Sequence, residues 1–289
     1  MMLSSKNKLF LQHGWVYFKV YCEEAYCEIL LAKLISPVIS TLNKKKLINC
    51  FFFIRYRDEN GTHLRIRFQC AEEIAYYKVI DVFLDSLSKK SNISKHIASV
   101  QLDSYEREIS RYGKTRIEKI ELIFCADSEI NIYLLESEKD IKQRWLKAMA
   151  LVSVYLKLIG LDYKDSLRLI EKCSQAYLPR FNPDKNEFGK INELYAKHRP
   201  QIYAYCDNPV DILKIPVSMV VSLSNSLQEL KLLLKSSGAE QTDIFRDLIH
   251  MSLNRFLPTN PNKNEFVIYE MLKLFLKSSM YRVTPKNKV

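Results

Sequence analysis

Alternating apolar and polar positions mark the segment from Phe51 to Phe68 as a β-hairpin. Two apolar runs flank the polar turn Asp-Glu-Asn-Gly, and the second run alternates three basic residues with three apolar ones. The basic residues are His63, Arg65 and Arg67, and the apolar residues are Leu64, Ile66 and Phe68. Because successive side chains of a strand point to opposite faces, each set is predicted to occupy one face. The apolar face suits a core, whereas the basic face needs another explanation.

The hydrophobic pattern around this hairpin predicts alternating strands and helices. A strand is expected over 14–22, a helix over 23–42 with an interruption near Pro37, a second helix over 72–88 and a weaker strand over 97–105. This order predicts an α+β fold in which an N-terminal antiparallel or mixed β-sheet has flanking helices.

Helical periodicity dominates after residue 116 and predicts a predominantly α-helical C-terminal half. The expected helices span 117–136, 140–158, 163–177, 187–205, 216–235, 242–256 and 265–277. Thr242 is expected to cap a helix that follows the stop signal Gly238, and Pro258 and Pro261 separate the last two helices. Polar motifs fall on both sides of the composition shift near residue 113. We therefore expect a single domain over 1–289, with a sheet part at 14–113, a helical part at 114–280 and a frayed basic tail at 281–289.

Composition narrows the function classes. The 289 residues are 47% hydrophobic and 27% charged, which is typical of a globular protein. Only 6 residues are Gly, which argues against a glycine-rich nucleotide-binding fold. The formal net charge of +11 favours an anionic partner, although a lysine-rich surface can also serve solubility alone.

Cysteine usage and motif searches exclude several kinds of site. The 7 Cys residues include no C-x-x-C pair, which argues against a disulfide framework or a zinc site and indicates a reducing, cytoplasmic location. No Walker loop, H-E-x-x-H motif, serine nucleophile elbow or carboxylate cluster occurs, so neither a metal nor a cofactor is predicted. No segment approaches the roughly 20 apolar residues of a spanning helix, so we expect no membrane span.

Two polar groups in the N-terminal half have a functional and a purely structural explanation. The basic strand face can hold a carboxylate, because Arg presents a planar fork of donors, or it can be a solvated surface. Glu108 and Arg111 are three residues apart, so a helical turn would let them pair. That pair can belong to a site or be an ordinary surface salt bridge.

Two further groups lie in predicted helices. Asp127-Ser128 follows an apolar run, and a helix-interior or capping role explains it best. His250 and Asn254 are four residues apart and share a helical face, with Arg255 near it. A His in an apolar helix can be a satisfied core residue, whereas His, Asn and Arg along one edge indicate a polar cleft.

Taken in order, these groups resemble the C-terminal elimination domain of class I lantibiotic dehydratases, which also occurs as stand-alone thiopeptide-type bacteriocin biosynthesis proteins. The resemblance spans about residues 14 to 280 and rests on an ordered set of motifs: Trp15-Val-Tyr-Phe-Lys-Val-Tyr21, Phe52-Phe-Ile-Arg-Tyr56 with Asp58, His63-Leu-Arg-Ile-Arg67, Tyr105-x-x-Glu108-x-x-Arg111-Tyr-Gly113, Phe124-x-x-Asp127-Ser128 and His250-Met-x-x-Asn254-Arg255. Lys114 departs from the family, which often has a second Gly there, and only a local effect on the turn is expected. The family's large glutamylation domain is absent from the sequence.

The resemblance implies a lyase that acts as one component of a split dehydratase. A separate glutamyl-tRNA-dependent protein would glutamylate Ser or Thr of a ribosomally synthesised precursor peptide. This chain would then expel glutamate and leave dehydroalanine or dehydrobutyrine. Carried over by position, the implied catalytic residues are Arg67, Glu108, Arg111 and His250, and the implied substrate-binding residues are His63, Arg65, Asn254 and Arg255.

Two other functions stay open at this point. Stand-alone relatives in thiopeptide pathways are pyridine synthases, which join two dehydroalanines in a formal cycloaddition and release the leader peptide. A non-catalytic module that binds a leader peptide or tRNA through its basic surface is a third possibility. A cyclase and a second copy of the chain are further candidate partners.

Overall fold

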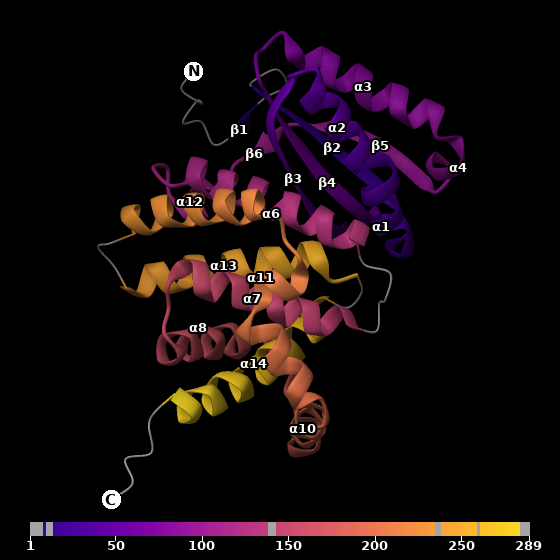
Figure 1. The fold of residues 1–289 in the computed structure, drawn as a ribbon. Helices are drawn as coiled ribbons and strands as arrows, with labels where there is room; N and C mark the ends of the chain where they lie inside the picture. Colours follow the sequence, from indigo (N-terminus) through magenta and orange to yellow (C-terminus); the bar gives the residue numbers. More distant parts are fainter. Residues whose placement is uncertain (1–7, 10–13, 138–142, 235–237, 259–260, 284–289) are drawn as a thin grey trace, which may run out of the picture. The chain divides into compact units, whose positions relative to one another are not determined.

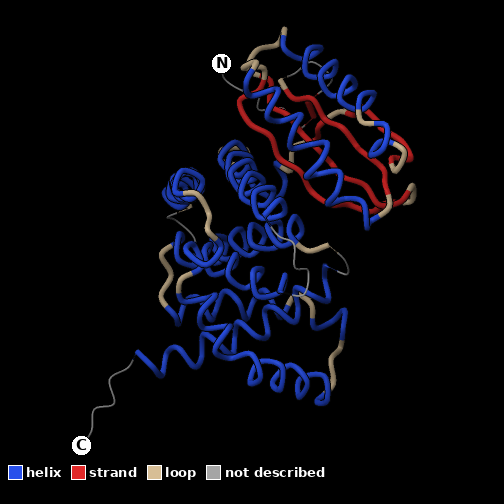
Figure 2. Tube along the Cα trace, turned by 45° about the vertical axis from the view of Figure 1, so that its right-hand side comes forward, coloured by secondary structure: helices blue, strands red, loops and turns tan. Residues whose placement is uncertain are grey.

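The computed structural model describes residues 8–9, 14–137, 143–234, 238–258 and 261–283. Contacts between Cα atoms divide the chain into two compact units, residues 1–138 and 139–289. We call them the sheet unit and the helical unit, and each is described by itself. Figure 2 shows that the strands lie in the sheet unit and that the helical unit is built from helices.

Four antiparallel strands form the central sheet of the sheet unit, in the order β3-β4-β2-β5. Their bounds are β2 Trp15–Cys22, β3 Ile48–Asp58, β4 Gly61–Cys70 and β5 Ile97–Asp103. β3 and β4 form the predicted hairpin, and Phe51 pairs with Phe68 at its far end. A separate two-stranded ladder joins β1 (Lys8–Leu9) to β6 (Tyr105–Glu106). The predicted α+β class and antiparallel sheet are confirmed.

Two helices pack on the apolar side of this sheet, α2 (Ser36–Lys44) and α3 (Ala75–Lys89). Figure 1 shows both running along the strands. Phe18 of β2 stacks on Phe83 of α3 with ring centroids 4.1 Å apart, and it meets Phe68 of β4 edge to face. Leu64, Ile66 and Phe68 are fully buried, as their alternation predicts. Short helices α4 (Ser91–Ser94) and α5 (Ile109–Tyr112), which the sequence did not predict, lie in the connections.

The first predicted helix is less regular than its sequence indicates. It consists of a 3-10 turn at Glu24–Tyr26, α1 (Cys27–Leu30), a π-helical turn at Leu31–Ile35 and then α2. Pro37 is the second residue of α2, directly after the π-helical turn. The run Glu24–Lys44 is long and apolar enough to span a membrane by length and composition, contrary to our expectation. Several of its apolar residues, including Leu30, Leu34 and Val38, are fully buried, as in the core helix of a globular unit, whereas Ile29 is 45% exposed.

The long helix α6 (Ile117–Ser137) belongs to the sheet unit, so the division falls well after the predicted shift at residue 113. α6 runs beside the edge strand β3, where the hydroxyl of Ser128 accepts a hydrogen bond from the Phe53 amide at 3.2 Å. Phe124 also packs on Phe52. These contacts hold α6 to the sheet in a way that hydrophobic periodicity alone does not reveal.

Helices α7 to α14 form the helical unit. Their bounds are α7 Arg144–Ile159, α8 Tyr163–Gln175, α9 Leu178–Phe181, α10 Lys185–Asp207, α11 Pro209–Leu213, α12 Val217–Leu233, α13 Gly238–Phe256 and α14 Pro261–Val283. Side-chain caps begin two of them: Asp162 caps α8, and Asp184 with Glu187 forms a capping box at α10. α7 ends at Gly160, whose φ of 75° suits glycine.

Several helix boundaries differ from those predicted from the sequence. α13 begins at Gly238, so Gly238 does not terminate the preceding helix and Thr242 lies inside α13 rather than at its cap. The short helix α9, which contains Pro179, lies between the predicted helices 163–177 and 187–205. α14 extends to Val283, so the predicted tail begins inside a helix, and residues 284–289 lie outside the described residues. Residues 140–142 of the predicted helix 140–158 and residue 235 of the predicted helix 216–235 also lie outside the described residues.

Candidate functional site

Arg67 of β4 lies in an aromatic enclosure on the sheet face opposite α3. It pairs with Tyr17 of β2 on one side and with Phe52 of β3 on the other. Its guanidinium carbon lies 4.4 Å from the ring centroid of Tyr17, 4.8 Å from that of Tyr105 and 5.0 Å from that of Phe52. The electron-rich faces of these rings attract the cation. Only 7% of Arg67 is exposed, so the solvated-surface explanation is wrong for this residue.

Arg67 has a buried positive charge without a matching carboxylate. Burial lowers the pKa of its guanidinium, because desolvation disfavours the charged form. In the described part of the chain, no carboxylate forms an ion pair with Arg67, and its buried Nε has no hydrogen-bond partner. Buried charges in proteins are usually paired. The geometry is therefore that of a cation held ready for an anionic ligand.

The other two basic residues of β4 are satisfied within the strand pair. Arg65 donates from Nε to Nε2 of His63 at 3.1 Å and stacks over Tyr56 at 3.4 Å. His63 is fully buried, 4.4 Å from the Tyr21 ring, and its Nδ1 lies 3.2 Å from the Gly61 carbonyl oxygen. Burial lowers the pKa of His63, which favours the neutral ring. His63 and Arg65, for which the resemblance implies substrate binding, are thus bonded to each other on this sheet face.

A buried ion pair fixes the loop that follows β5. Arg107 donates to both carboxylate oxygens of Glu121 on α6, at 2.8 and 2.6 Å, and both residues are 2% exposed. The Tyr105 hydroxyl donates to the same carboxylate at 2.8 Å. Burial raises the pKa of Glu121, and the bonds from Arg107 and Tyr105 oppose that rise. Glu121 thereby holds the Tyr105 ring over Arg67.

Arg107 and Glu121 are not among the site residues predicted from the sequence. The available signal was a carboxylate inside the apolar run Ile120-Glu-Leu-Ile-Phe, a position where an unpaired charge would be costly. Nothing in the sequence names its partner, because the two residues are 14 positions apart and meet through a loop.

Glu108 and Arg111 pair as their spacing predicts. Arg111 Nη1 donates to Glu108 Oε2 at 3.2 Å, and the two side chains are 41% and 49% exposed. This geometry is that of a surface ion pair. Arg111 is also the second arginine of this segment, four residues after Arg107. The turn after α5 favours Gly113, because its φ of 82° is strained for a residue with a side chain. Lys114 has no positive φ, which is consistent with its lack of a glycine.

Asp127 and Ser128 have the structural role that was expected of them. Both are fully buried in α6. Ser128 binds the backbone of β3, and Asn131 donates to the Asp127 carboxylate at 3.1 Å. They hold α6 in place and offer no group to a ligand.

His250 of α13 forms the second candidate site, within the helical unit. Its Nδ1 lies 2.9 Å from Oε2 of Glu265 on α14, and Glu265 is fully buried. The hydroxyls of Tyr177 and Tyr269 donate to the same Glu265 oxygen, at 2.7 and 3.1 Å. A carboxylate at Nδ1 fixes the imidazole tautomer and stabilises its protonated form. This arrangement suits a residue that accepts and releases a proton.

A cavity of about 270 Å³ adjoins this histidine. It is lined by His250, Tyr177, Tyr269, Cys173, Ala176, Arg246 and Asp247. Burial raises the pKa of the Cys173 thiol, which makes that cysteine a poor nucleophile. His250 lines this cavity, and its side chain is 34% exposed.

Arg255 and Asn254, the other two residues predicted for this site, differ in their exposure. Arg255 is fully buried, so its charge does not face an open cleft. Asn254, four residues from His250, is half-buried.

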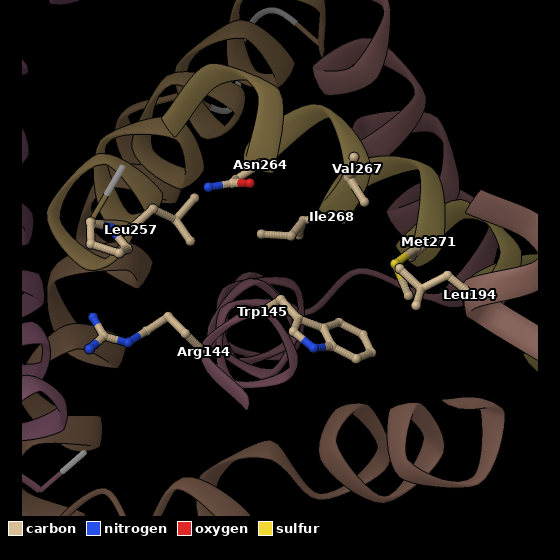
Figure 3. A pocket seen from close by; sticks show the side chains of 9 residues that line it. Arg144, Trp145, Leu194, Leu257, Asn264, Val267, Ile268 and Met271 are labelled. Carbon is tan, nitrogen blue, oxygen red and sulfur yellow. The ribbon is translucent and has the colours of Figure 1, made fainter. Parts of the chain in front are cut away.

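The helical unit also contains an apolar cavity of about 320 Å³ between α7 and α14 (Figure 3). Trp145 and Ile268 line it, with Arg144 and Asn264 among its polar residues. Arg144 donates to the Phe256 carbonyl oxygen at 3.0 Å, which ties α7 to the end of α13. Among the described residues, no group of three His, Cys, Asp or Glu side chains could hold a metal ion.

Comparisons with known proteins agree on one family. A family model described as the C-terminal part of lantibiotic biosynthesis dehydratases matches residues 15–276. The subtilin biosynthesis protein SpaB of Bacillus subtilis is 29% identical over 63% of this chain and 17% of its own length. The epidermin biosynthesis protein EpiB of Staphylococcus epidermidis and the nisin biosynthesis protein NisB of Lactococcus lactis are 24% and 25% identical over 91% of the chain. The chain spans about a quarter or less of the length of these relatives.

Solved structures show the same fold at low identity. The tRNA-dependent lantibiotic dehydratase MibB from a Microbispora species matches with a TM-score of 0.69 and 16% identity, over 94% of this chain and 28% of that one. TsrL matches with a TM-score of 0.63 and 10% identity, and this chain covers 95% of it. The pyridine synthase TbtD from thiomuracin biosynthesis matches with a TM-score of 0.59 and 16% identity, and this chain covers 99% of it.

Proposed function

The chain belongs to the family of lantibiotic biosynthesis dehydratase C-terminal domains, and we propose that it eliminates glutamate from glutamylated Ser or Thr residues of a precursor peptide. A base removes the α-proton of the modified residue, and the electron pair forms the Cα=Cβ double bond. The Cβ–O bond breaks, and glutamate leaves with both electrons of that bond. The product is dehydroalanine from Ser or dehydrobutyrine from Thr.

The observation that carries this proposal is the unpaired charge of Arg67. A glutamyl ester brings a side-chain carboxylate to the enzyme, and the leaving glutamate carries a second one. Arg67 offers a desolvated guanidinium without a carboxylate of its own among the described residues. Arg–carboxylate hydrogen bonds strengthen in a water-poor environment. Arg67, assisted by Arg111, accordingly binds the glutamyl carboxylate.

Proton transfer is assigned to His250. An α-proton of a peptide residue is weakly acidic, so its removal needs a positioned base whose conjugate acid is stabilised. Glu265 provides that stabilisation at Nδ1, and the cavity admits a ligand to the imidazole. Glu108 orients Arg111 through their ion pair. Glu265 is a positioning residue, because it acts through His250.

The partners follow from the reaction. A separate glutamyl-tRNA-dependent protein supplies the glutamylated peptide, and the precursor peptide carries a leader and a Ser- or Thr-containing core. Similarity to the tRNA-dependent lantibiotic dehydratase MibB and to the nisin biosynthesis protein NisB supports a peptide substrate.

The test is incubation of the protein with a synthetic peptide that carries one O-glutamyl serine, followed by mass spectrometry. The proposal expects loss of one glutamic acid and formation of dehydroalanine. His250→Ala should leave the glutamylated peptide unchanged, with turnover reduced by about 10²–10⁴. His198→Ala, which changes a histidine of α10 bonded to Gln201, should retain turnover. Full elimination by His250→Ala would remove His250 from the mechanism.

A second function is favoured by one observation: the chain covers 99% of the solved pyridine synthase TbtD. In that case the protein would join two dehydroalanines in a formal cycloaddition and release the leader. A dehydrated peptide that loses only its leader, together with a glutamyl peptide that stays intact, would establish this alternative. Salt-sensitive tRNA binding without turnover of either peptide would instead indicate a binding module.

A further inference from the structure

The two edges of the central sheet are treated differently. At the β3 edge, the Phe53 amide is satisfied by Ser128 of α6. At the opposite edge, β5 pairs with β2 alone among the residues that the structure describes. An edge strand leaves a row of backbone donors and acceptors without strand partners.

β5 also lacks the usual protection of an edge. Its sequence Ile-Ala-Ser-Val-Gln-Leu-Asp contains no Pro and no Lys or Arg. Ala98, Ser99, Gln101 and Leu102 are exposed. Proteins normally blunt such an edge with charges, proline or a covering element, because it can pair with another chain. An open edge of seven residues is therefore a candidate binding surface.

The register shows which backbone groups face outward. The Gly14 carbonyl oxygen accepts from the Cys70 amide at 2.8 Å, so Gly14 is directed toward β4. In antiparallel strands the N–H and C=O of one residue point to the same side, and sides alternate along the strand. Odd-numbered residues of β2 are therefore directed toward β5, and Lys19 forms a hydrogen-bonded pair with Gln101. It follows that Val100 and Leu102 direct their N–H and C=O groups toward the open edge.

The hydrogen bond at the β3 edge independently shows the same alternation of inward- and outward-directed backbone groups. Phe53 donates outward to Ser128, so its partner Ile66 is directed toward Phe18 of β2. This agrees with the assignment from Gly14. The two outward N–H groups of β5 thus lie two residues apart, the spacing with which an added strand pairs.

We propose that β5 binds an extended segment of the precursor peptide as an added strand. The proposal rests on the proposed function, since it assumes a peptide substrate. Main-chain bonds would supply affinity with little dependence on sequence. Asp103 stands in one row with Tyr17 and Arg67. A peptide residue paired with Asp103 extends this row, and its side chain lies on the face that carries Arg67.

Continuity with the Arg67 site favours this occupant, and the one charged side chain of β5, Asp103, is ion-paired with Lys19 at 2.6 Å. β5 ends two residues before Tyr105, the ring that lies 4.8 Å from the Arg67 guanidinium carbon. The glutamyl group of a bound peptide carries a carboxylate that can pair with the positive charge of Arg67. A second copy of the chain is less well suited, because a seven-residue strand spans only about 23 Å. Such a contact presents far less than the roughly 1,000 Å² of a stable interface.

The experiment compares Leu102→Pro with Leu102→Thr. Proline removes the outward N–H without removing a bond to β2, and threonine changes the side chain but keeps the amide. The probe is a short fluorescent peptide of alternating Thr and Gln around one central Ser, with or without an O-glutamyl group. Leu102→Pro should weaken binding of the unglutamylated probe about tenfold and raise KM for the glutamylated probe similarly, with kcat retained. Leu102→Thr should behave like the unchanged protein.

A second measurement does not depend on the folding of the proline variant. Two further probes carry N-methyl groups, one at its odd-numbered residues and the other at its even-numbered residues. One of them should lose binding and the other should keep it, because only every second amide of an added strand faces β5. Equal affinity for the two N-methylated probes, or unchanged binding by folded Leu102→Pro, would overturn the proposal. A dimer that dissociates in Leu102→Pro while probe affinity is unchanged would also overturn it.

The outcomes separate this inference from the proposed function. Binding that depends on the β5 amide, without any loss of glutamate, would refute elimination and leave the docking strand in place. Elimination with unchanged KM in Leu102→Pro would refute the docking strand and leave elimination in place.

Discussion

The two candidate sites hold their charged groups in opposite ways. In the sheet unit, Arg67 is a buried cation surrounded by three aromatic rings, with no carboxylate paired to it among the described residues. In the helical unit, His250 is half-exposed and bonded to the buried carboxylate of Glu265. In our proposal, the anionic glutamyl group completes the first arrangement. The second already has its counter-charge, so it suits the transfer of a proton.

The largest expected effect concerns the counter-charge of His250. Glu265→Gln removes the negative charge but keeps the size of the side chain, so the imidazole loses its fixed tautomer. We expect kcat for elimination to fall by on the order of 10²–10⁴ and by no more than in His250→Ala, because Glu265 acts through that histidine. Single-turnover mass spectrometry of the glutamyl peptide measures the change.

Glu270→Gln is the matched control, since Glu270 lies on the same helix, is also buried and bonds Lys273 at 2.7 Å. It should lose stability without losing turnover. Equal losses of turnover in the two variants would show that the carboxylate supports the fold rather than His250.

The buried ion pair beneath the Arg67 enclosure should dominate the stability of the sheet unit. Glu121→Gln leaves the Arg107 guanidinium buried without a full counter-charge, and this loss should reduce the free energy of unfolding by about 3–5 kcal/mol. Glu108→Gln breaks an exposed pair instead and should change it by about 0–1 kcal/mol. Urea unfolding measures both, and similar values for the two variants would refute the distinction.

Arg67 and Arg65 should respond oppositely to the same substitution. Arg67→Met places an apolar side chain among aromatic rings and removes a desolvated charge, so the free energy of unfolding should rise by about 1 kcal/mol. Elimination should be lost at the same time. Arg65→Met removes the bond to His63 and should lower the free energy of unfolding by about 1 kcal/mol. A loss of stability in Arg67→Met would indicate that the cation supports the fold rather than a ligand.

The smallest effect is a pH dependence from His63. Burial lowers the pKa of this histidine in the folded protein, so the unfolded chain binds a proton that the folded protein rejects. Its contribution to stability is therefore complete above the unfolded pKa of about 6.5 and is lost as pH falls toward the lower folded value. Urea unfolding at pH 7.5 and pH 5.5 should show lower stability at the acid pH. His63→Gln should reduce that difference, whereas an unchanged difference would assign it to other groups.

The sequence by itself determined most of the elements. Alternation fixed the hairpin and the opposite faces of Leu64 and Arg67, because strand geometry has a period of two residues. The spacing of Glu108 and Arg111 was enough to predict their ion pair. The ordered motifs indicated the family that the comparisons confirm.

Tertiary structure decided which of these polar groups are available to a ligand. On one strand face, Arg65 is bonded to His63, whereas Arg67 is enclosed by rings from β2, β3 and the loop after β5. The partners Arg107 and Glu121, and likewise His250 and Glu265, are brought together by loops and helix packing that periodicity does not encode. Local patterns set the type of each element, but the burial and charge balance of a side chain depend on residues far away in the sequence.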